Sequence, residues 1–274
     1  MSDVLQLSGV PGWTPLDNSG DPGVESDRNV LSEVTEARHL ASGTEASPPA
    51  SVAEKLGRRH SAATPYLQYL TQLVQRLFLT QDRSGEPIRS VAFVGVGTRH
   101  DSSLFPAAAA ELLAARVSGR ICLVDAVVRK PSLHDCYGVS NDIGLVDAWH
   151  GTGPVRSYAR RLVQGHESSL WLLPSGTARD SSELTADDVQ ARMRDLTAAF
   201  DYVIIAAPSV TDHPVATAIA AQVDGVVLIV EAHATRRRAV RASADAVRSA
   251  GGRVLGTVLS NRTFPIPEAI YRLL

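Results

Sequence analysis

Six short runs of almost entirely apolar residues constrain the fold of this chain most. They are SVAFVGV, RICLVDAVV, SLWLLPSG, YVIIAAPSV, GVVLIVEA and RVLGTVLS, and all of them follow residue 88. Strands that are apolar on both faces are typical of sheets covered by helices on both sides. The segments between them have helical patterns, as in PAAAAELLAARV, DDVQARMRDLTAAF, HPVATAIAAQV and TRRRAVRASADAVRSA. This alternation predicts an α/β fold, a doubly wound and mostly parallel sheet that binds ligands beyond the carboxyl ends of its strands.

The first 62 residues differ in composition from the rest. They are rich in Ser, Gly, Pro, Asp and Glu and show no sustained period of 2 or 3.6 residues. Such a segment buries too little apolar surface to offset its ordering entropy. We therefore expect residues 1–62 to be a disordered, mildly acidic tail, with a short helix over residues 30–40 as the weaker alternative.

The α/β domain is then expected over residues 63–274. It opens with YLQYLTQLVQRLFL, in which apolar residues recur at helical spacing after Pro65. This pattern predicts a helix that packs on the domain, with a free partner-binding helix as the weaker alternative.

The charge balance and the cysteine count limit the class of protein. The chain has 27 basic and 29 acidic residues, whereas binding to nucleic-acid phosphates normally leaves a basic excess, so we expect no nucleic-acid partner. Cys122 and Cys136 form no C-x-x-C pair, which is typical of a reducing, cytoplasmic compartment. No run approaches the ~20 apolar residues that span a bilayer. We expect no direct membrane insertion, so any membrane association would come through a partner.

The loop after the first predicted strand has the setting of a phosphate-binding loop without its lysine. In G-x-x-x-x-G-K-[ST], backbone N–H groups cradle phosphates and the lysine reaches the β and γ phosphates. The stretch VAFVGVGTRHDSSLFP has no lysine, and the whole chain has two, Lys55 and Lys130. The candidate nucleotide-binding residues of this stretch are Gly95, Gly97, Arg99, Ser102 and Ser103.

Two interpretations of this loop remain open. In the first, Asp101, Ser102 or Ser103 caps a helix that has Pro106 in its first turn, and no nucleotide is needed. In the second, Arg99 and the helix N-terminus bind an anion.

Two other predicted strand ends carry the remaining candidates. Asp125 ends the second strand and Arg129 follows it. The carboxylate of Asp125 could hold magnesium through water, pair with Arg129 or cap a turn, and spacing alone does not decide between these roles. The fourth strand ends in Ala206 and Ala207, whose methyl groups cannot orient water.

Two further charged groups indicate helix starts. Asp212 and His213 are adjacent and do not face each other, so a helix cap is a better interpretation than an acid–base pair. The three arginines at 236–238 begin a helix, where positive charge opposes the dipole. A solvated face is the simpler interpretation of that run, and an anion or partner contact is the alternative.

From about residue 65 to 274 the chain resembles the cytoplasmic tyrosine autokinases of bacterial capsule and exopolysaccharide synthesis, a branch of the MinD-like P-loop ATPases. The resemblance rests, in order, on LVDAVVRKPSLH, LLPSGTARDSSEL, FDYVIIAAPSV, VDGVVLIVEAHATRRRAV, AGGRVLGTVLSNR and PEAIYRLL. It implies a P-loop NTPase-like fold and, in active members, a protein-tyrosine kinase that uses ATP and magnesium.

The departures from the family pattern fall on charged groups. The resemblance places residues 101–103 at the last glycine, the lysine and the first hydroxyl of the first motif, where this chain has Asp, Ser and Ser. Asp125 matches the first aspartate of the second motif, Val127 replaces the second, and Ala206 replaces the Walker B aspartate. Phosphoryl transfer depends on positioned positive charge and metal. We therefore assign no catalytic or metal-binding residue and expect no cofactor.

We accordingly expect a catalytically degenerate member of the family, a pseudokinase that serves exopolysaccharide synthesis. The resemblance implies that it acts as a regulator or structural partner of an inner-membrane chain-length protein, or polysaccharide co-polymerase. It would be cytoplasmic and peripheral to the inner membrane through that partner. Homo-oligomer formation stays open, since YLQYLTQLVQRLFL lacks the family's oligomerisation pattern.

Two alternatives remain. The first is an active ATP-dependent tyrosine kinase or ATPase with a variant P-loop, in which Arg99 or Lys130 replaces the missing lysine and ATP and magnesium are bound. The second is a positioning ATPase related to MinD and the partition proteins.

Overall fold

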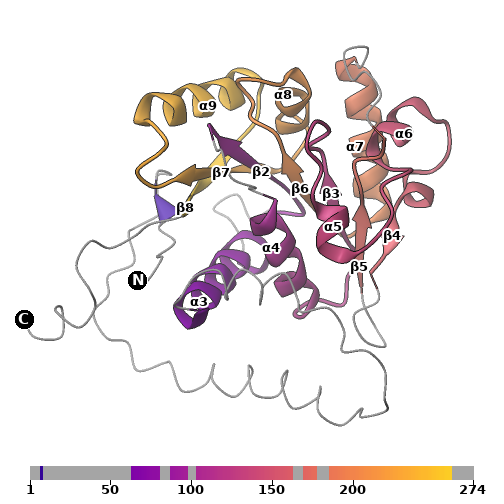
Figure 1. Cartoon of the computed structure of the whole chain (residues 1–274), viewed down its shortest axis with the longest axis horizontal. Coiled ribbons are helices and arrows are strands. Elements are labelled where there is room, and N and C mark those ends of the chain that lie inside the picture. The colour runs from indigo at the N-terminus through magenta and orange to yellow at the C-terminus, as the bar shows by residue number, and fades with distance from the viewer. Residues whose placement is uncertain are drawn as a thin grey trace, which may run out of the picture. The chain divides into compact units, whose positions relative to one another are not determined.

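The computed structural model describes residues 7–8, 63–80, 87–97, 103–162, 169–177 and 185–260. Its sheet has eight strands in the order β1-β8-β7-β2-β6-β3-β5-β4 (Figure 1). The six inner strands are parallel: β8 (Val254–Ser260), β7 (Gly225–Glu231), β2 (Ser90–Val96), β6 (Tyr202–Ala207), β3 (Ile121–Asp125) and β5 (Leu170–Leu173). The two-residue strands β1 (Leu7–Ser8) and β4 (Arg160–Arg161) pair antiparallel at the two edges.

Helices cover both faces of the sheet, as Figure 1 shows. One face carries α6 (Leu145–His150), α7 (Ala186–Ala199), α8 (Pro214–Ala220) and α9 (Arg237–Ser249). The other carries α3 (Ala63–Val74) with its π-helical continuation η1 (Gln75–Leu79), α4 (Leu104–Ala114) and α5 (Leu133–Tyr137). The short 3₁₀ helix η2 (Val155–Tyr158) precedes β4. The expectation of a doubly wound, mostly parallel α/β fold is confirmed.

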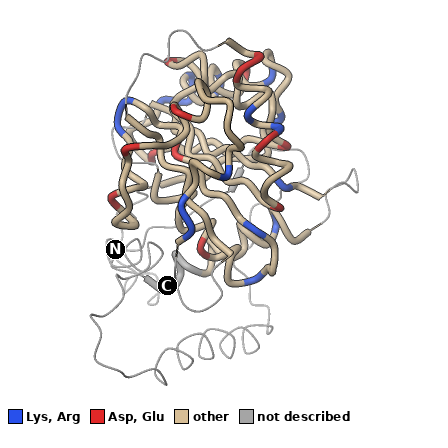
Figure 2. Tube along the Cα trace, turned by 90° about the vertical axis from the view of Figure 1, so that its right-hand side faces the viewer, with Lys and Arg blue, Asp and Glu red and all other residues tan. Residues whose placement is uncertain are grey.

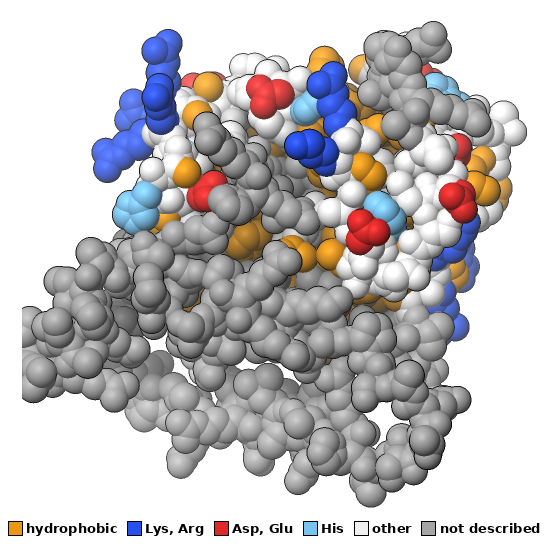
Figure 3. Space-filling model, viewed as in Figure 1, with side chains coloured by type: hydrophobic (Ala, Val, Ile, Leu, Met, Phe, Trp, Pro, Cys, Tyr) orange, Lys and Arg blue, Asp and Glu red, His pale blue; other side chains and the backbone are white. Residues whose placement is uncertain are grey.

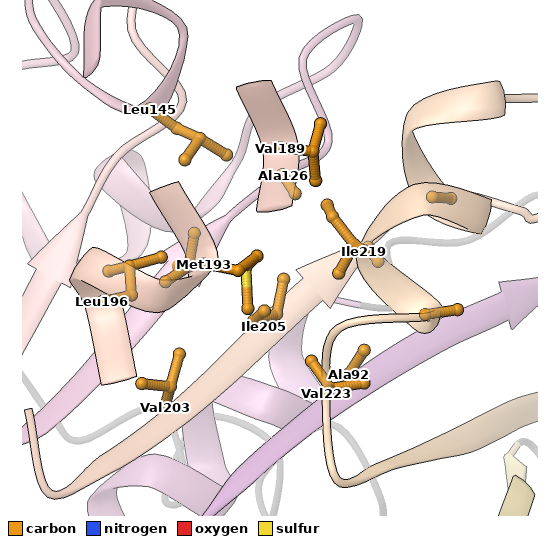
Figure 4. Packing of buried hydrophobic residues seen from close by; sticks show 14 of the residues in the cluster. Ala92, Ala126, Leu145, Val189, Met193, Leu196, Val203, Ile205, Ile219 and Val223 are labelled. Carbon is orange, nitrogen blue, oxygen red and sulfur yellow. The ribbon is translucent and has the colours of Figure 1, made fainter. Parts of the chain in front are cut away.

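Alternation along the strands divides the core into two buried clusters. Val91 and Phe93 of β2 face the α3–α4 cluster, whereas Ala92 and Val94 face the α7–α8 cluster, because successive strand residues point to opposite faces. In the second cluster, Val189 and Met193 of α7 and Ile219 of α8 lie over Val203 and Ile205 of β6, among the side chains drawn in Figure 4. Helices α7 and α8 therefore pack on β6.

The predicted first helix packs on the domain, as expected. Its apolar face is buried at Leu70, Leu73, Val74, Leu77 and Phe78, and α3 contacts α4. The ring of Phe78 lies edge-on to Tyr202 of β6, with 5.9 Å between ring centroids. Helix α3 is thus part of the core. The side chain of Leu67, which the pattern also placed on this face, lies outside the described residues.

The predicted N-terminal tail needs one correction. Leu7–Ser8 forms strand β1 and pairs with Val258 and Thr257 of β8, so the sheet includes two residues of the expected tail. The rest of residues 1–62, including the alternative helix over residues 30–40, lies outside the described residues. The tail boundary therefore stays a prediction.

The connection between β3 and β5 contains elements that the sequence pattern did not predict. These are α5, α6, η2 and β4, which have five, six, four and two residues. A helix of five or six residues spans less than two turns, so its apolar residues cannot establish a period. Tertiary packing of Leu133, Leu145 and Trp149 into the two clusters stabilises these pieces.

Charged residues of both signs are interspersed along the described trace (Figure 2), which agrees with the near balance of charge in the sequence. Within the described ranges, no helix combines the length and apolar character that crossing a bilayer requires.

Candidate functional site

The carboxyl ends of β7, β2, β6 and β3 meet at one edge of the sheet, because these neighbouring strands are parallel. In register, Asp125 of β3 lies beside Ala206 of β6, and Val94 of β2 lies beside Ala207. The structure therefore brings together the end of β2, Asp125 and the alanines of β6, as the sequence predicted for a doubly wound sheet.

Of the two candidate glycines, the structure places one inside β2 and the other directly after it. Gly95 is a buried residue inside β2, paired with Ile229 of β7, so it belongs to the strand and not to the loop. Gly97 has φ 58° and nothing lies within 4 Å of where its Cβ would be. The left-handed backbone therefore favours glycine at this position, whereas the space around it would admit a side chain. Residues 98–102, which include Arg99 and Ser102, lie outside the described residues.

Ser103 is the N-cap residue of α4 but does not cap it with its side chain. It is 2% exposed, and its carbonyl accepts a hydrogen bond from the N–H of Ala107 at 3.2 Å. The prediction of a helix start here, with Pro106 in the first turn, is confirmed. Of the three candidate caps, Ser103 does not cap the helix with its side chain, because its own backbone is helical (φ −69°, ψ −21°) and not extended as in a capping residue. Whether Asp101 or Ser102 caps the helix stays a prediction.

Asp125 is fully buried and its carboxylate binds three backbone N–H groups. Oδ1 accepts from Val127 at 3.1 Å, and Oδ2 accepts from Ser132 and Leu133, both at 3.1 Å. These bonds close the loop 126–132 and satisfy donors at the start of α5. Arg129 is exposed and makes no ion pair with a described residue. These contacts of Asp125 are those of a turn cap, one of the three roles left open for it.

The neighbouring strand offers no second carboxylate. Ala206 is 2% exposed, and its carbonyl accepts the N–H of Ala126 at 2.8 Å. Within the parallel strands as described, the other acid at a carboxyl end is Glu231 of β7, three strand spacings from β3 and hence about 14 Å away. Magnesium needs oxygen ligands about 2 Å away in a near-octahedral shell. Among the described residues, the carboxyl ends of β3 and β6 therefore supply one carboxylate, that of Asp125.

Helix α8 starts where the sequence predicted, after Asp212 and His213. His213 is the N-cap residue, but no side-chain cap bond forms, and Oδ1 of Asp212 accepts instead from the hydroxyl of Thr211 at 3.2 Å. The helix-start interpretation is confirmed, although the side-chain cap is not seen. The run at 236–238 likewise begins α9, with Arg236 as its N-cap residue.

The sequence analysis missed a link between the β7–α9 loop and the first loop. The hydroxyl of Thr235 accepts the N–H of Glu231 at 3.0 Å and donates to the carbonyl of Val96, at the end of β2, at 3.2 Å. His233 in the same loop has φ 63°, which is uncommon for a residue with a side chain. Ser and Thr hydroxyls often bond nearby backbone groups in turns, but the second partner of Thr235, in β2, is 139 positions away.

A second missed contact holds the loop after β5. The side-chain amide of Asn141 donates to the carbonyl of Gly176 at 3.1 Å and accepts its N–H at 2.9 Å. Next to it, Ser175 is fully buried, and its hydroxyl has no hydrogen-bond partner among the described residues. The hydroxyl of Ser132 and Nδ1 of His134 are in the same condition. These polar atoms lie around the start of α5 and the end of β5, within the stretches LVDAVVRKPSLH and LLPSGTARDSSEL, where the sequence analysis named none of the three as a candidate.

Comparison with curated proteins gives two relatives. No family model matches the chain. The chain is 30% identical over 191 residues to the succinoglycan biosynthesis transport protein ExoP of Rhizobium meliloti, which covers 68% of this chain and 24% of that protein. It is 26% identical over 148 residues to CapB of Staphylococcus aureus, named as a tyrosine-protein kinase, covering 53% of this chain and 64% of CapB. The chain thus spans less than two thirds of the length of either relative.

Solved structures show the same fold. The kinase domain of the Escherichia coli tyrosine kinase ETK superposes with a TM-score of 0.61 at 17% identity, covering 85% of this chain and 90% of that one. The MinD cell division protein of Aquifex aeolicus superposes with a TM-score of 0.51 at 17% identity, covering 67% of this chain and 72% of that one. The fold is therefore that of the MinD-like P-loop NTPases. With the sequence relatives, these likenesses confirm the resemblance found in the motifs: the chain belongs to the tyrosine autokinase family of bacterial polysaccharide biosynthesis.

Proposed function

We propose that this protein is a catalytically degenerate member of its family, which serves exopolysaccharide synthesis as a regulator or structural partner of a membrane chain-length protein. The observation that carries the proposal is the environment of Asp125. It is the one retained acid of the altered motifs, and its carboxylate is fully buried with three backbone N–H groups bound to it.

The bonds of Asp125 compete with a role in metal binding. A carboxylate has about four acceptor sites, and three of them are taken up by Val127, Ser132 and Leu133. Recruiting Asp125 to a metal shell would open the loop 126–132 and leave its N–H groups unsatisfied, at about 1–3 kcal/mol each.

The neighbouring position supports the same proposal. Ala206 adjoins Asp125 in the sheet register, and its methyl group supplies no ligand. Loss of a single contact to the transition-state charge typically costs about 10²- to 10³-fold in rate. Loss of a lysine and two carboxylates together would leave too little of the apparatus for useful phosphoryl transfer.

A scaffold that keeps its fold without this chemistry suits protein binding. In this proposal the chain is cytoplasmic and lies at the inner membrane through its partner, the chain-length protein. We expect the tagged full-length chain to be retained on native membranes that contain this partner. We expect it to be released when the partner is deleted. Unchanged retention without the partner would contradict the partner role.

The test of degeneracy is nucleotide binding by the full-length protein. Titration calorimetry with ATP and magnesium is expected to give no heat of binding at up to millimolar nucleotide. A matched variant, Ser102→Lys combined with Ala206→Asp, restores two of the lost groups and is expected to bind ATP more tightly than the wild type. Micromolar affinity in the wild type would contradict the proposal.

The active-enzyme alternative has its own test. Lys130 is exposed in the loop after β3, so its ammonium is accessible to a ligand at the strand ends. The wild type and the Lys130→Ala variant are compared in a radioactive-phosphate transfer assay. Transfer that the wild type performs and the variant does not would favour a kinase with a variant P-loop. We expect no transfer from either protein.

A further inference from the structure

A groove of about 580 Å³ runs beside α9, on the face that this helix shares with β7 and β8. It starts at the β7–α9 loop, at Glu231 and His233, and continues along α9 as far as Arg248. It does not include Asp125 or Ala206. The groove is therefore a feature separate from the pair of residues on which the proposed loss of catalysis rests.

The floor of the groove is apolar and incompletely covered. Val230 of β7, Val240 of α9 and Val254 and Leu259 of β8 all line it and are all half-buried. Sheets of this class normally carry helices over both faces. Among the described residues, no helix beyond α9 covers the outer strand on this face. The groove thus presents aliphatic side chains that a further segment could bury.

Arginines outnumber acids along the groove, whose lining includes three arginines of α9 and the two acids Glu231 and Asp245. Arg237, Arg241 and Arg248 line it from α9. They are spaced by four and seven residues and so share one side of the helix over about 16 Å. Arg248 is paired with Asp245 at 3.0 Å, whereas Arg237 and Arg241 are exposed and form no ion pair with a described residue. Figure 3 shows basic side chains projecting where α9 begins.

We propose that this groove binds an acidic, partly apolar peptide segment of another protein. Carboxylates of the segment would pair with Arg237 and Arg241, and its apolar side chains would cover the valines of the floor. Arginine pairs carboxylates through two parallel hydrogen bonds, which suits it to this role. Arginines in the first turn of a helix oppose its dipole, and bound carboxylates relieve that opposition.

The shape of the site favours a peptide over an anionic membrane surface. A lipid surface is flat and would also attract Arg236 and Arg238, which are exposed on the same helix start but do not line the groove. A peptide segment lying in the groove would contact Arg237 and Arg241 but not the other two arginines. The two pairs have equal charge and lie within the first two turns of the helix, so they make matched variants.

The test measures binding of a fluorescein-labelled 12-residue peptide of alternating Glu and Leu to the full-length chain by fluorescence anisotropy. The double variant Arg237→Glu with Arg241→Glu is expected to weaken binding about tenfold or more, because two charge-assisted pairs become repulsive. The matched variant Arg236→Glu with Arg238→Glu is expected to weaken it less than about threefold. The same peptide with Gln in place of Glu is expected to bind at least about tenfold more weakly.

A third variant tests the floor without changing charge. Ala244 lines the groove and is half-buried, so Ala244→Phe is expected to fill it and to weaken peptide binding by about tenfold. The glutamate variants place negative charge at a helix start, which stabilises the helix, so their thermal midpoints are expected to match or exceed that of the wild type.

Three results would overturn the proposal. Equal weakening by both arginine pairs would mean unspecific attraction to a basic surface. Tight binding to vesicles of phosphatidylglycerol and phosphatidylcholine, lost equally in both pairs, would assign the surface to lipid. Binding of the peptide only after the chain is shortened to end at Ser260 would assign the groove to residues 261–274 of this chain.

Discussion

One buried carboxylate illustrates how single residues act in this protein. Asp125 satisfies three backbone N–H groups, and hydrogen bonds to a charged group each contribute about 1.5–3 kcal/mol. Asp125→Ala is expected to lower the free energy of unfolding by about 4–5 kcal/mol, the low end of the sum of three such bonds, and Asp125→Asn, which keeps one acceptor oxygen, by less. Urea denaturation measures both changes.

The control for this prediction is Asp212→Ala, because Asp212 is exposed at the start of α8. It is expected to change the free energy of unfolding by less than about 0.5 kcal/mol. Equal, small effects of the two alanine variants would show that the buried bonds of Asp125 do not stabilise the loop 126–132.

A second acid gives a pH-dependent prediction. The carboxylate of Asp201 accepts the backbone N–H of Arg120 at 2.8 Å and its Nε at 3.3 Å. The backbone bond, followed by the guanidinium, lowers the pKa of Asp201 from its ordinary value of 3.8. A lowered pKa means stabilisation that is present above pH 3.8 and is lost as the pH falls through the folded-state value.

The Asp201→Asn variant is therefore expected to be less stable than the wild type at pH 7 and closer to it at pH 3. Both side chains are about half exposed, so the difference is expected to be small and to decrease with added salt. Urea midpoints of the two proteins at pH 7, 5 and 3 measure it. A deficit that stays constant over this range would contradict a role for the ionised carboxylate.

At the scale of an element, helix α3 and its continuation η1 form part of the core. Leu70 has no exposed surface and faces α4. Leu70→Ala is expected to cost about 2–5 kcal/mol of unfolding free energy, since it leaves a cavity that its neighbours fill only partly. Thermal and urea unfolding report the loss.

The matched control lies two residues away on the same helix. Gln68 is exposed, and Gln68→Ala is expected to be neutral or slightly stabilising because alanine has the higher helix propensity. If Leu70→Ala were as neutral as Gln68→Ala, α3 would be a free helix, as the alternative interpretation of its sequence holds.

At the scale of the whole molecule, the prediction concerns where the folding unit begins. The described part of residues 1–62 is strand β1, which contributes two residues at the edge of the sheet. A chain of residues 63–274 is therefore expected to unfold cooperatively, within about 1–2 kcal/mol of the full-length protein. Calorimetry and circular dichroism provide the comparison.

Starting the chain at residue 81 instead removes α3 and η1 and uncovers the face of the sheet and of α4 that they bury. That chain is expected to aggregate or to unfold without a cooperative transition. Equal stability of the two shortened chains would place the domain boundary after η1 and contradict the boundary at residue 63.

Elements that carry their own periodic signal were predictable from the sequence. The apolar runs identify all six parallel strands, and the helical pattern identifies α3, α4, α7, α8 and α9. Strand β3 nevertheless ends at Asp125, before its apolar run does. The run continues because Ala126 is buried after the strand has ended. Burial without strand pairing gives the same local pattern as a strand.

The site was predictable in its location but not in its bonding. Parallel strands force the first loop, Asp125 and Ala206 to one edge, which the strand order alone implies. The choice of turn capping for Asp125 depended on the positions of the N–H groups of Ser132 and Leu133, seven and eight residues away. No local pattern fixes such a contact.

The sequence by itself thus determined the fold class, the two-sided burial of the strands, the edge at which the altered motifs meet and the family. These depend on local periodicity and on residue identity, which are present in the chain before it folds. Only the tertiary structure decided that the carboxylate of Asp125 is bound by backbone N–H groups and that Arg237 and Arg241 border an apolar groove. Each of these depends on contacts between segments brought together by packing, such as α9 against β7 and β8.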